Sequence, residues 1–242
     1  MSFRLVARTG HPDFLDLPWE EPLDEWTSSR LVEVARGIGR HVVRFVDYDG
    51  VLYALKELPP RLAQREYRLL RELADVGLPA VESVGVVTDR ESTEEAVLIT
   101  RYLDFSLPYR LVLQRRILPA PLSSLLDAYA ELLVRLHVTG FFWGDCSLSN
   151  TLFRRDAGAL SAYFVDAETA EWHEQLSDGQ RLHDLEIAQE NLVGELYDLE
   201  QELGRVGDSD PFELADEVGL RYSGLWTELT AEEVFAPDEQ FR

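Results

Sequence analysis

The stretch that decides the fold is LHVTGFFWGDCSLSNTLF, residues 136–153. It carries Asp145 and, five residues later, Asn150, inside a run too apolar for an ordinary surface loop. Asp166 follows sixteen residues after Asn150, at the end of the predicted strand AYFV, residues 162–165. An acid, an amide and a second acid at strand ends suit a divalent cation that bridges phosphate oxygens. Each residue alone is weak evidence, because Asp and Asn in loops are most often turn or cap residues.

One lysine stands apart from every other basic residue. Of the 23 basic residues, 22 are arginine, and the single lysine is Lys56. A compact ammonium and a planar guanidinium are not interchangeable at a tight site, so the retained lysine is a candidate functional residue. The alternative is chance survival at a neutral surface position.

A carboxylate interrupts the apolar face of the helix predicted over residues 62–77. At 100° per residue, Glu66 falls in the middle of that face. A buried carboxylate needs a partner, and an ion pair with Lys56 on the preceding strand satisfies both groups. The alternative is a Glu66 that reaches water or pairs with an arginine. These residues form an ordered set: a lysine, a glutamate, an aspartate with an asparagine five residues later, and a second aspartate. As a signal for a phosphate and metal site, the whole set is much more specific than any one of its residues. The apolar face consists of Leu62, Leu69, Leu70 and Leu73.

Composition limits the class of protein. The 242 residues are 45% hydrophobic and 28% charged, so the chain can bury a core. The formal net charge of -22 repels nucleic acid and anionic lipid, which we therefore exclude as partners. A single cysteine, Cys146, excludes an internal disulfide or a multi-cysteine zinc site and fits a reducing compartment. Without a signal peptide or transmembrane segment in the sequence, we expect a cytoplasmic protein.

The order of predicted elements indicates two lobes. Residues 1–29, rich in proline and tryptophan, are expected to form an extended arm with short turns. A small β-rich N-lobe is predicted over 30–103, and a mostly helical C-lobe with the catalytic and metal loops over 104–242. The fold class is therefore α+β. Strands are predicted at 31–37, 41–50, 51–58, 81–89, 95–103 and 160–168, and helices at 62–77, 123–140, 181–204 and 210–229.

The C-terminal part carries two helix-start signals. Asp210 is expected as the N-cap of the last long helix, with Pro211 at its first position. Thr230 and Glu233 have the spacing of a capping box, which predicts the start of a further helix.

Five segments together resemble the protein-kinase-like fold in its compact bacterial form. The resemblance covers about residues 30–200. Over this range the sequence is similar to aminoglycoside and choline phosphotransferases and to lipopolysaccharide (Kdo) kinases. It is closest to a bacterial lipopolysaccharide-kinase-like family whose members usually carry a further C-terminal domain of unknown function. The segments are VLYALKEL (51–58), REYRLLREL (65–73), LITRYL (98–103), LHVTGFFWGDCSLSNTLF (136–153) and AYFVDAET (162–169).

The resemblance implies a role for each member of the ordered set, with ATP and Mg²⁺ as cofactors. Lys56 would hold the α and β phosphates, and Glu66 would orient Lys56. Asp145 would be the catalytic base, and Asn150 and Asp166 would bind magnesium.

The resemblance also implies an adenine site and a brace. Thr100 matches the gatekeeper, so the backbone of Arg101 and Leu103 would bind the adenine edge. Asp184 matches the aspartate that braces the catalytic loop from below. An ordinary helix N-cap is the alternative reading of Asp184.

The sequence departs from the family pattern at several positions. Trp143 stands where these phosphotransferases have histidine, so this position is expected to pack rather than to hydrogen-bond. Ala167 and Glu168 replace Phe and Gly after the metal aspartate, and Glu168 is a candidate second carboxylate for the metal. Gly37 and Gly39 represent the glycine-rich loop without its third glycine, as a phosphate cradle or as a plain hairpin turn.

Three functions are compatible with these residues. The first is an ATP- and Mg²⁺-dependent phosphotransferase acting on a small-molecule, sugar or glycolipid hydroxyl, since Asp184 follows only eighteen residues after Asp166 and leaves no room for a long peptide-docking segment. The second is a pseudokinase that serves as a nucleotide-binding regulatory or scaffolding module. The third is transfer of AMP. The Thr230–Glu233 signal and the acidic charge further suggest an additional C-terminal domain or a basic protein partner.

Overall fold

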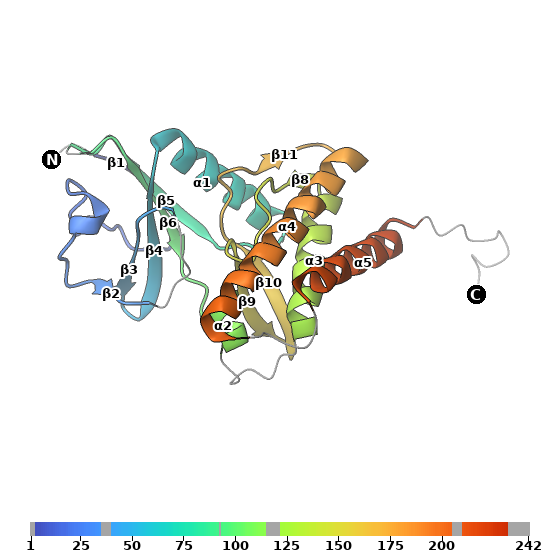
Figure 1. Cartoon of the computed structure of the whole chain (residues 1–242). Helices are drawn as coiled ribbons and strands as arrows, with labels where there is room; N and C mark the ends of the chain where they lie inside the picture. The colour runs from blue at the N-terminus through green and yellow to red at the C-terminus, as the bar shows by residue number, and fades with distance from the viewer. Residues whose placement is uncertain (1–2, 35–39, 92, 115–121, 205–209, 232–242) are drawn as a thin grey trace.

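The computed structural model describes residues 3–34, 40–91, 93–114, 122–204 and 210–231. A β-rich lobe lies on one side and a helical lobe on the other (Figure 1). The N-lobe contains one antiparallel sheet in the order β1-β5-β6-β4-β3-β2. Its elements are β1 (Arg4–Ala7), the 3-10 turn η1 (Leu23–Glu25), β2 (Leu31–Val32), β3 (Val43–Tyr48), β4 (Val51–Leu58), α1 (Pro60–Asp75), β5 (Ser83–Thr88) and β6 (Ala96–Arg101).

The β3–β4 hairpin determines which way Lys56 points. Asp49 and Gly50 form its two-residue loop with φ of 55° and 83°, and this left-handed pair matches the twist of the flanking strands. Side chains then alternate along β4, so that Leu55 faces outward and Lys56 inward. The hairpin register thus places the lysine over the cleft.

The outer face of the sheet is covered by the N-terminal arm. Aromatic and leucine side chains of the arm pack on outward-facing residues of β3 to β6 in a separate apolar cluster. Glu57, next to Lys56 but facing outward, accepts from the backbone N–H of Leu23 and from Arg90. The arm also forms an edge strand of the sheet, β1, which its irregular sequence did not predict. The buried arm residues are Phe14, Leu17, Trp19, Leu23 and Trp26.

The C-lobe is built around α3, which packs against α5 and β10. Its core continues through α1 to the inner face of the N-lobe sheet, so one apolar cluster joins the lobes. The elements are β7 (Leu107–Pro108), α2 (Tyr109–Gln114), α3 (Leu122–Val138), β8 (Phe141–Phe142), β9 (Thr151–Asp156), β10 (Ala159–Phe164), β11 (Glu171–Trp172), α4 (Asp178–Leu203) and α5 (Pro211–Thr230). The three-stranded sheet β10-β9-β7 and the pair β11-β8 flank the candidate catalytic loop.

Some predicted elements differ from the structure. The strand expected at 31–37 is confined, within the described residues, to β2. Thr230 is the last residue of α5 and so lies inside a helix instead of starting one; its hydroxyl donates to the carbonyl of Trp226 one turn earlier. The expected capping box is therefore wrong at Thr230, and Glu233 lies outside the described residues. Asp210 does cap α5, with Pro211 at the first position.

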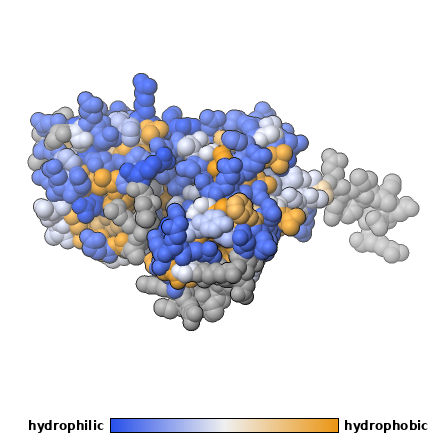
Figure 2. Space-filling view, viewed as in Figure 1, coloured by the Kyte–Doolittle hydropathy of each residue, from blue (hydrophilic) through white to orange (hydrophobic). Residues whose placement is uncertain are grey.

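The described surface is mostly hydrophilic, as expected for a chain of which 28% of the residues are charged. In the view of Figure 2, hydrophilic residues cover most of the described surface and apolar residues occur in scattered groups. Among the described residues, no helix combines the length and the apolar character needed to cross a membrane.

Candidate active site

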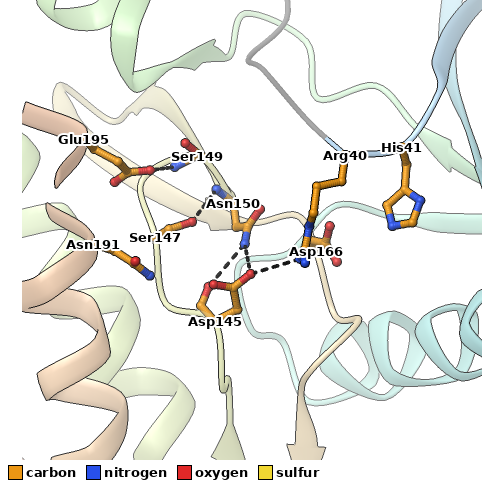
Figure 3. A pocket seen from close by; sticks show the side chains of 9 residues that line it. All are labelled: Arg40, His41, Asp145, Ser147, Ser149, Asn150, Asp166, Asn191 and Glu195. Carbon is orange, nitrogen blue, oxygen red and sulfur yellow. Dashed lines mark hydrogen bonds and ion pairs between the residues drawn. The ribbon is translucent and has the colours of Figure 1, made fainter. Parts of the chain in front are cut away.

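A cavity of about 420 Å³ lies at the junction of the two lobes. Figure 3 shows its lining, which comes from the segment before β3, from the loop between β8 and β9, from the end of β10 and from α4. Asp145, Asn150 and Asp166, predicted as one site from sequence, all line it. The remaining lining residues are Arg40, His41, Ser147, Ser149, Asn191 and Glu195.

Lys56 lies between two carboxylates. Its Nζ is 3.0 Å from Oε2 of Glu66 and 2.7 Å from Oδ2 of Asp166. The predicted Lys56–Glu66 ion pair is therefore present, and the tertiary structure adds Asp166 to it. Sequence reasoning placed Asp166 among the metal ligands and did not foresee this contact.

Burial controls the protonation of the ion pair. Only 1% of the Glu66 side chain is exposed, and α1 holds it against the backbone N–H of Ala167. Burial and the nearby carboxylate of Asp166 raise the pKa of Glu66 to about 7, against the opposing effect of Lys56. Burial by itself would lower the pKa of Lys56, but Glu66 and Asp166 more than offset this and raise it. Lys56 is therefore held as an ammonium.

The base candidate Asp145 lies beside Asn150. The Asn150 amide nitrogen donates to Oδ2 of Asp145 at 3.2 Å and to its backbone carbonyl at the same distance. The Asn150 backbone N–H donates to Oγ of Ser147, which closes the turn. From the N-lobe, Arg40 reaches Oδ2 of Asp145 at 3.5 Å. The five-residue spacing of Asp145 and Asn150 thus becomes direct contact of their side chains.

Asp184 on α4 braces the candidate catalytic loop, residues 143–150. Its carboxylate accepts from the backbone N–H of Trp143 at 2.7 Å and of Gly144 at 2.8 Å. Gly144 has φ of 79°, and a Cβ there would lie 3.1 Å from the carbonyl oxygen of Thr169, so glycine is required. Asp184 is fully buried inside α4, whose N-cap is Ser177, so the N-cap alternative for Asp184 is wrong.

A buried chain of hydrogen bonds holds Asp184 in turn. Nε2 of His137 on α3 lies 3.1 Å from the Asp184 carboxylate, and its Nδ1 lies 2.8 Å from the hydroxyl of Tyr222 on α5. Arg181 donates to the same hydroxyl. Three helices therefore fix one carboxylate. In the sequence, the members of this hydrogen-bond network are recognisable only as polar residues on helices with apolar faces.

Two further side chains of α4 contact the loop, and sequence reasoning missed both. Asn191 donates to the backbone carbonyl of Cys146 at 2.8 Å. Glu195 accepts from the backbone N–H groups of Leu148 at 2.9 Å and Ser149 at 2.8 Å. Burial raises the pKa of Glu195, and the hydrogen bonds from Ser149 and Leu148 oppose that effect. The signal in the sequence is their helical spacing from Asp184.

The other predicted residues lie around this centre. Trp143 is fully buried, packs against Tyr129 and Phe164, and its indole nitrogen has no hydrogen-bond partner in the described part of the chain. This packing confirms the expectation from sequence. The Glu168 carboxylate lies 2.9 Å from Nε2 of His41, which joins the metal loop to the N-lobe. Glu168 does not line the cavity.

The predicted nucleotide loop and hinge are only partly described. Gly37 and Gly39 lie outside the described residues, so the choice between cradle and hairpin turn is not made by the structure. Arg101 ends β6, and its backbone N–H is taken by the carbonyl of Glu82. Leu103, two residues on, is half-buried. Their contact with adenine stays a prediction.

The oxygen groups on the cavity wall fit a magnesium ion carried by a nucleotide. Within the described residues, no group of three or more His, Cys, Asp or Glu side chains could hold a metal ion. Mg²⁺, however, takes one or two carboxylates and leaves its other positions to water and substrate phosphates. Asp166 supplies a carboxylate, and Asn150 uses its amide nitrogen on Asp145, which leaves the amide oxygen as a ligand.

Comparison with known proteins agrees with this geometry. Residues 49–194, more than half of the chain, match the model of the lipopolysaccharide kinase (Kdo/WaaP) family. A search of curated protein sequences found no match. The solved structure of WaaP in complex with acyl carrier protein is 18% identical with a TM-score of 0.59, covering 93% of this chain and 89% of that one. An aminoglycoside-3'-phosphotransferase of type VIII is 14% identical with a TM-score of 0.54, covering 86% and 88%. The predicted two-lobed kinase-like fold is thereby confirmed.

Proposed function

Because the chain belongs to the lipopolysaccharide kinase (Kdo/WaaP) family, we propose that it transfers the γ-phosphoryl group of ATP, with Mg²⁺, to a sugar or glycolipid hydroxyl. A cytoplasmic location, where ATP is supplied, is part of this proposal. The observation that carries it is that Asp145, Asn150 and Asp166 line one cavity from separate segments, while Lys56 contacts the Asp166 carboxylate at 2.7 Å.

Each residue has a defined task in this reaction. Asp145 accepts the proton of the acceptor hydroxyl as that oxygen attacks the γ-phosphorus, the bond from the γ-phosphorus to the β–γ bridging oxygen breaks and ADP leaves. Lys56, kept charged by Glu66, holds the α and β phosphates in place. Asn150 and Asp166 would hold Mg²⁺, which when bound would supply positive charge against the phosphate oxygens. Glu168 remains a candidate additional metal ligand from sequence alone; its backbone N–H donates to Asp166, while its carboxylate contacts His41.

The acceptor side of the cavity supports a hydroxyl compound. Ser147, Ser149 and Asn191 line the cavity on the C-lobe side, next to Asp145 (Figure 3). Hydroxyl and amide groups of this kind form hydrogen bonds with the hydroxyl groups of a sugar. We infer a sugar or glycolipid acceptor from this lining and from the family.

Two variants separate the metal role from the base role. Asp166→Asn should weaken binding of ATP with Mg²⁺ at least about tenfold, because a carboxylate ligand is lost. Asp145→Asn should retain binding and lose turnover, because only the proton acceptor is removed. Isothermal titration with ATP and MgCl₂, with ATP hydrolysis measured in parallel, tests both variants.

Asp75→Asn, at the exposed end of α1, is the matched control and should behave as the parent. Equal binding losses in Asp166→Asn and Asp145→Asn would contradict the assignment of roles. A parent that binds ATP but transfers phosphate to no sugar or water would support a nucleotide-binding regulatory module instead.

A further inference from the structure

Helix α4 presents a row of polar side chains to the catalytic loop. Asp184, Asn191 and Glu195 are seven and four residues apart, so the helical period places them on one face. Ala188 lies between Asp184 and Asn191 in the sequence and is fully buried. Each of the three forms hydrogen bonds with backbone groups of the loop.

The contacts of Asn191 and Glu195 fall on the loop between Asp145 and Asn150. The proposed base and metal ligand must keep a fixed separation. Asn191 binds the carbonyl of Cys146, directly after Asp145. Glu195 accepts from the N–H groups of Leu148 and Ser149, the two residues directly before Asn150. Figure 3 shows its contact with Ser149. The loop from Asp145 to Asn150 is therefore fastened to α4 at both ends.

We propose that Asn191 and Glu195 are positioning residues that fix Asp145 and Asn150 relative to each other, and this rests on the proposed phosphotransfer at the same site. The loop's own hydrogen bonds run through Ser147 and Asn150, and the N–H groups of Leu148 and Ser149 find their partner on α4. The Glu195 carboxylate accepts from both, and for the buried Leu148 an N–H without a partner would cost about 1–3 kcal/mol. Fixing the loop in advance lowers the cost of bringing metal ligand and base into register.

The chemistry requires glutamate rather than glutamine at residue 195. Both carboxylate oxygens accept a backbone N–H, whereas glutamine offers one oxygen and turns an NH₂ group toward a second donor. Glu195→Gln keeps the size of the side chain and removes one of the two contacts. Asn191→Ala removes the single bond to Cys146 and serves as a milder second variant.

Amide hydrogen exchange measures the fastening directly and needs no substrate. In Glu195→Gln, exchange at Leu148 and Ser149 should accelerate at least about tenfold, the equivalent of one lost hydrogen bond. Glu190→Gln, on the exposed side of the same helix, should leave these rates unchanged. If Leu148 and Ser149 exchange in Glu195→Gln as they do in the parent, the proposal is wrong.

Magnesium dependence tests the consequence for the site. The Mg²⁺ concentration that gives half-maximal stabilisation by ADP should rise about fivefold to tenfold in Glu195→Gln and less in Asn191→Ala, because Asn150 is displaced. A merely structural role would lower the melting temperature and leave this concentration unchanged, which would overturn the proposal. A parent that binds no Mg²⁺–ADP would refute the proposed function, and hydrogen exchange would still decide whether α4 holds the loop. If Glu195→Gln does not fold, Asn191→Ala decides both measurements.

Discussion

On the N-lobe side of the cleft, Lys56 is held by side chains, the carboxylates of Glu66 and Asp166. On the C-lobe side, the loop of residues 143–149 is held through its backbone, by carboxylate and amide groups of α4. The N-lobe side is thus held by ion pairs between side chains, and the C-lobe side by hydrogen bonds between side chains of α4 and backbone N–H and C=O groups. We therefore expect substitutions that remove a charge, and changes of pH, to act through Lys56 and Glu66. We expect substitutions that remove a single hydrogen bond to act through the side chains of α4.

The largest effect is expected where the charge itself acts on the substrate. Lys56→Met should lower ATP turnover at least about 1000-fold, because the phosphates lose their cation while the stem still fills the channel. Lys56→Arg should also be poor, since a planar guanidinium does not fit between two carboxylates spaced for an ammonium. Steady-state kinetics with circular dichroism as the folding check tests this prediction.

Arg61→Met, an exposed cation at the start of α1, provides the control and should keep parental turnover. Turnover by Lys56→Met at the parental rate would remove the central assignment and with it the contrast between the two sides.

On the backbone-capping side, the expected effect is on stability. Asp184→Ala leaves the N–H groups of Trp143 and Gly144 and the ring of His137 without their buried acceptor. We expect a loss of about 4 kcal/mol in the free energy of unfolding, measured by urea denaturation. Asp198→Ala, on the exposed side of α4, should change it by less than about 0.5 kcal/mol. Similar losses in both variants would show that the brace contributes nothing specific.

The smallest effect concerns the pH dependence of the charged side. The pKa of Glu66 is about 7 in the folded protein and 4.5 as its ordinary value. Between these values the folded state holds a proton that the unfolded state releases, so the contribution of Glu66 to stability falls as pH rises. The stability advantage of the parent over Glu66→Gln should therefore shrink by up to about 3 kcal/mol from pH 4.5 to pH 7, and stay constant above.

Urea denaturation of parent and Glu66→Gln at several pH values gives this difference. Glu72→Gln, an exposed position on the same helix, is the control and should track the parent across the range. If the stability advantage of the parent over Glu66→Gln grows with pH, the pKa of Glu66 is lowered in the folded protein. The attraction of Lys56 would then outweigh the effects of burial and Asp166.

The sequence alone predicted the residues whose chemistry is unusual for their surroundings. Glu66 stands out because a carboxylate on an apolar helix face costs free energy without a partner, and Lys56 because it is the only lysine. The hairpin at Asp49 and Gly50 and the cap at Asp210 were also predictable, because turn and cap chemistry is local. Local patterns therefore predicted the order of elements, whereas the roles of the candidate site residues came from the family resemblance.

The tertiary structure alone decided what holds these residues in place. Asp184 could be an N-cap or a brace by its sequence, and only the packing of α4 under the loop selects the brace. Asn191 and Glu195 look like ordinary polar residues of a surface helix, since their partners are backbone groups more than 40 residues away in sequence. Every non-proline residue carries the same N–H and C=O groups. A sequence therefore shows which side chains are unusual, whereas only the fold shows which backbone groups they reach.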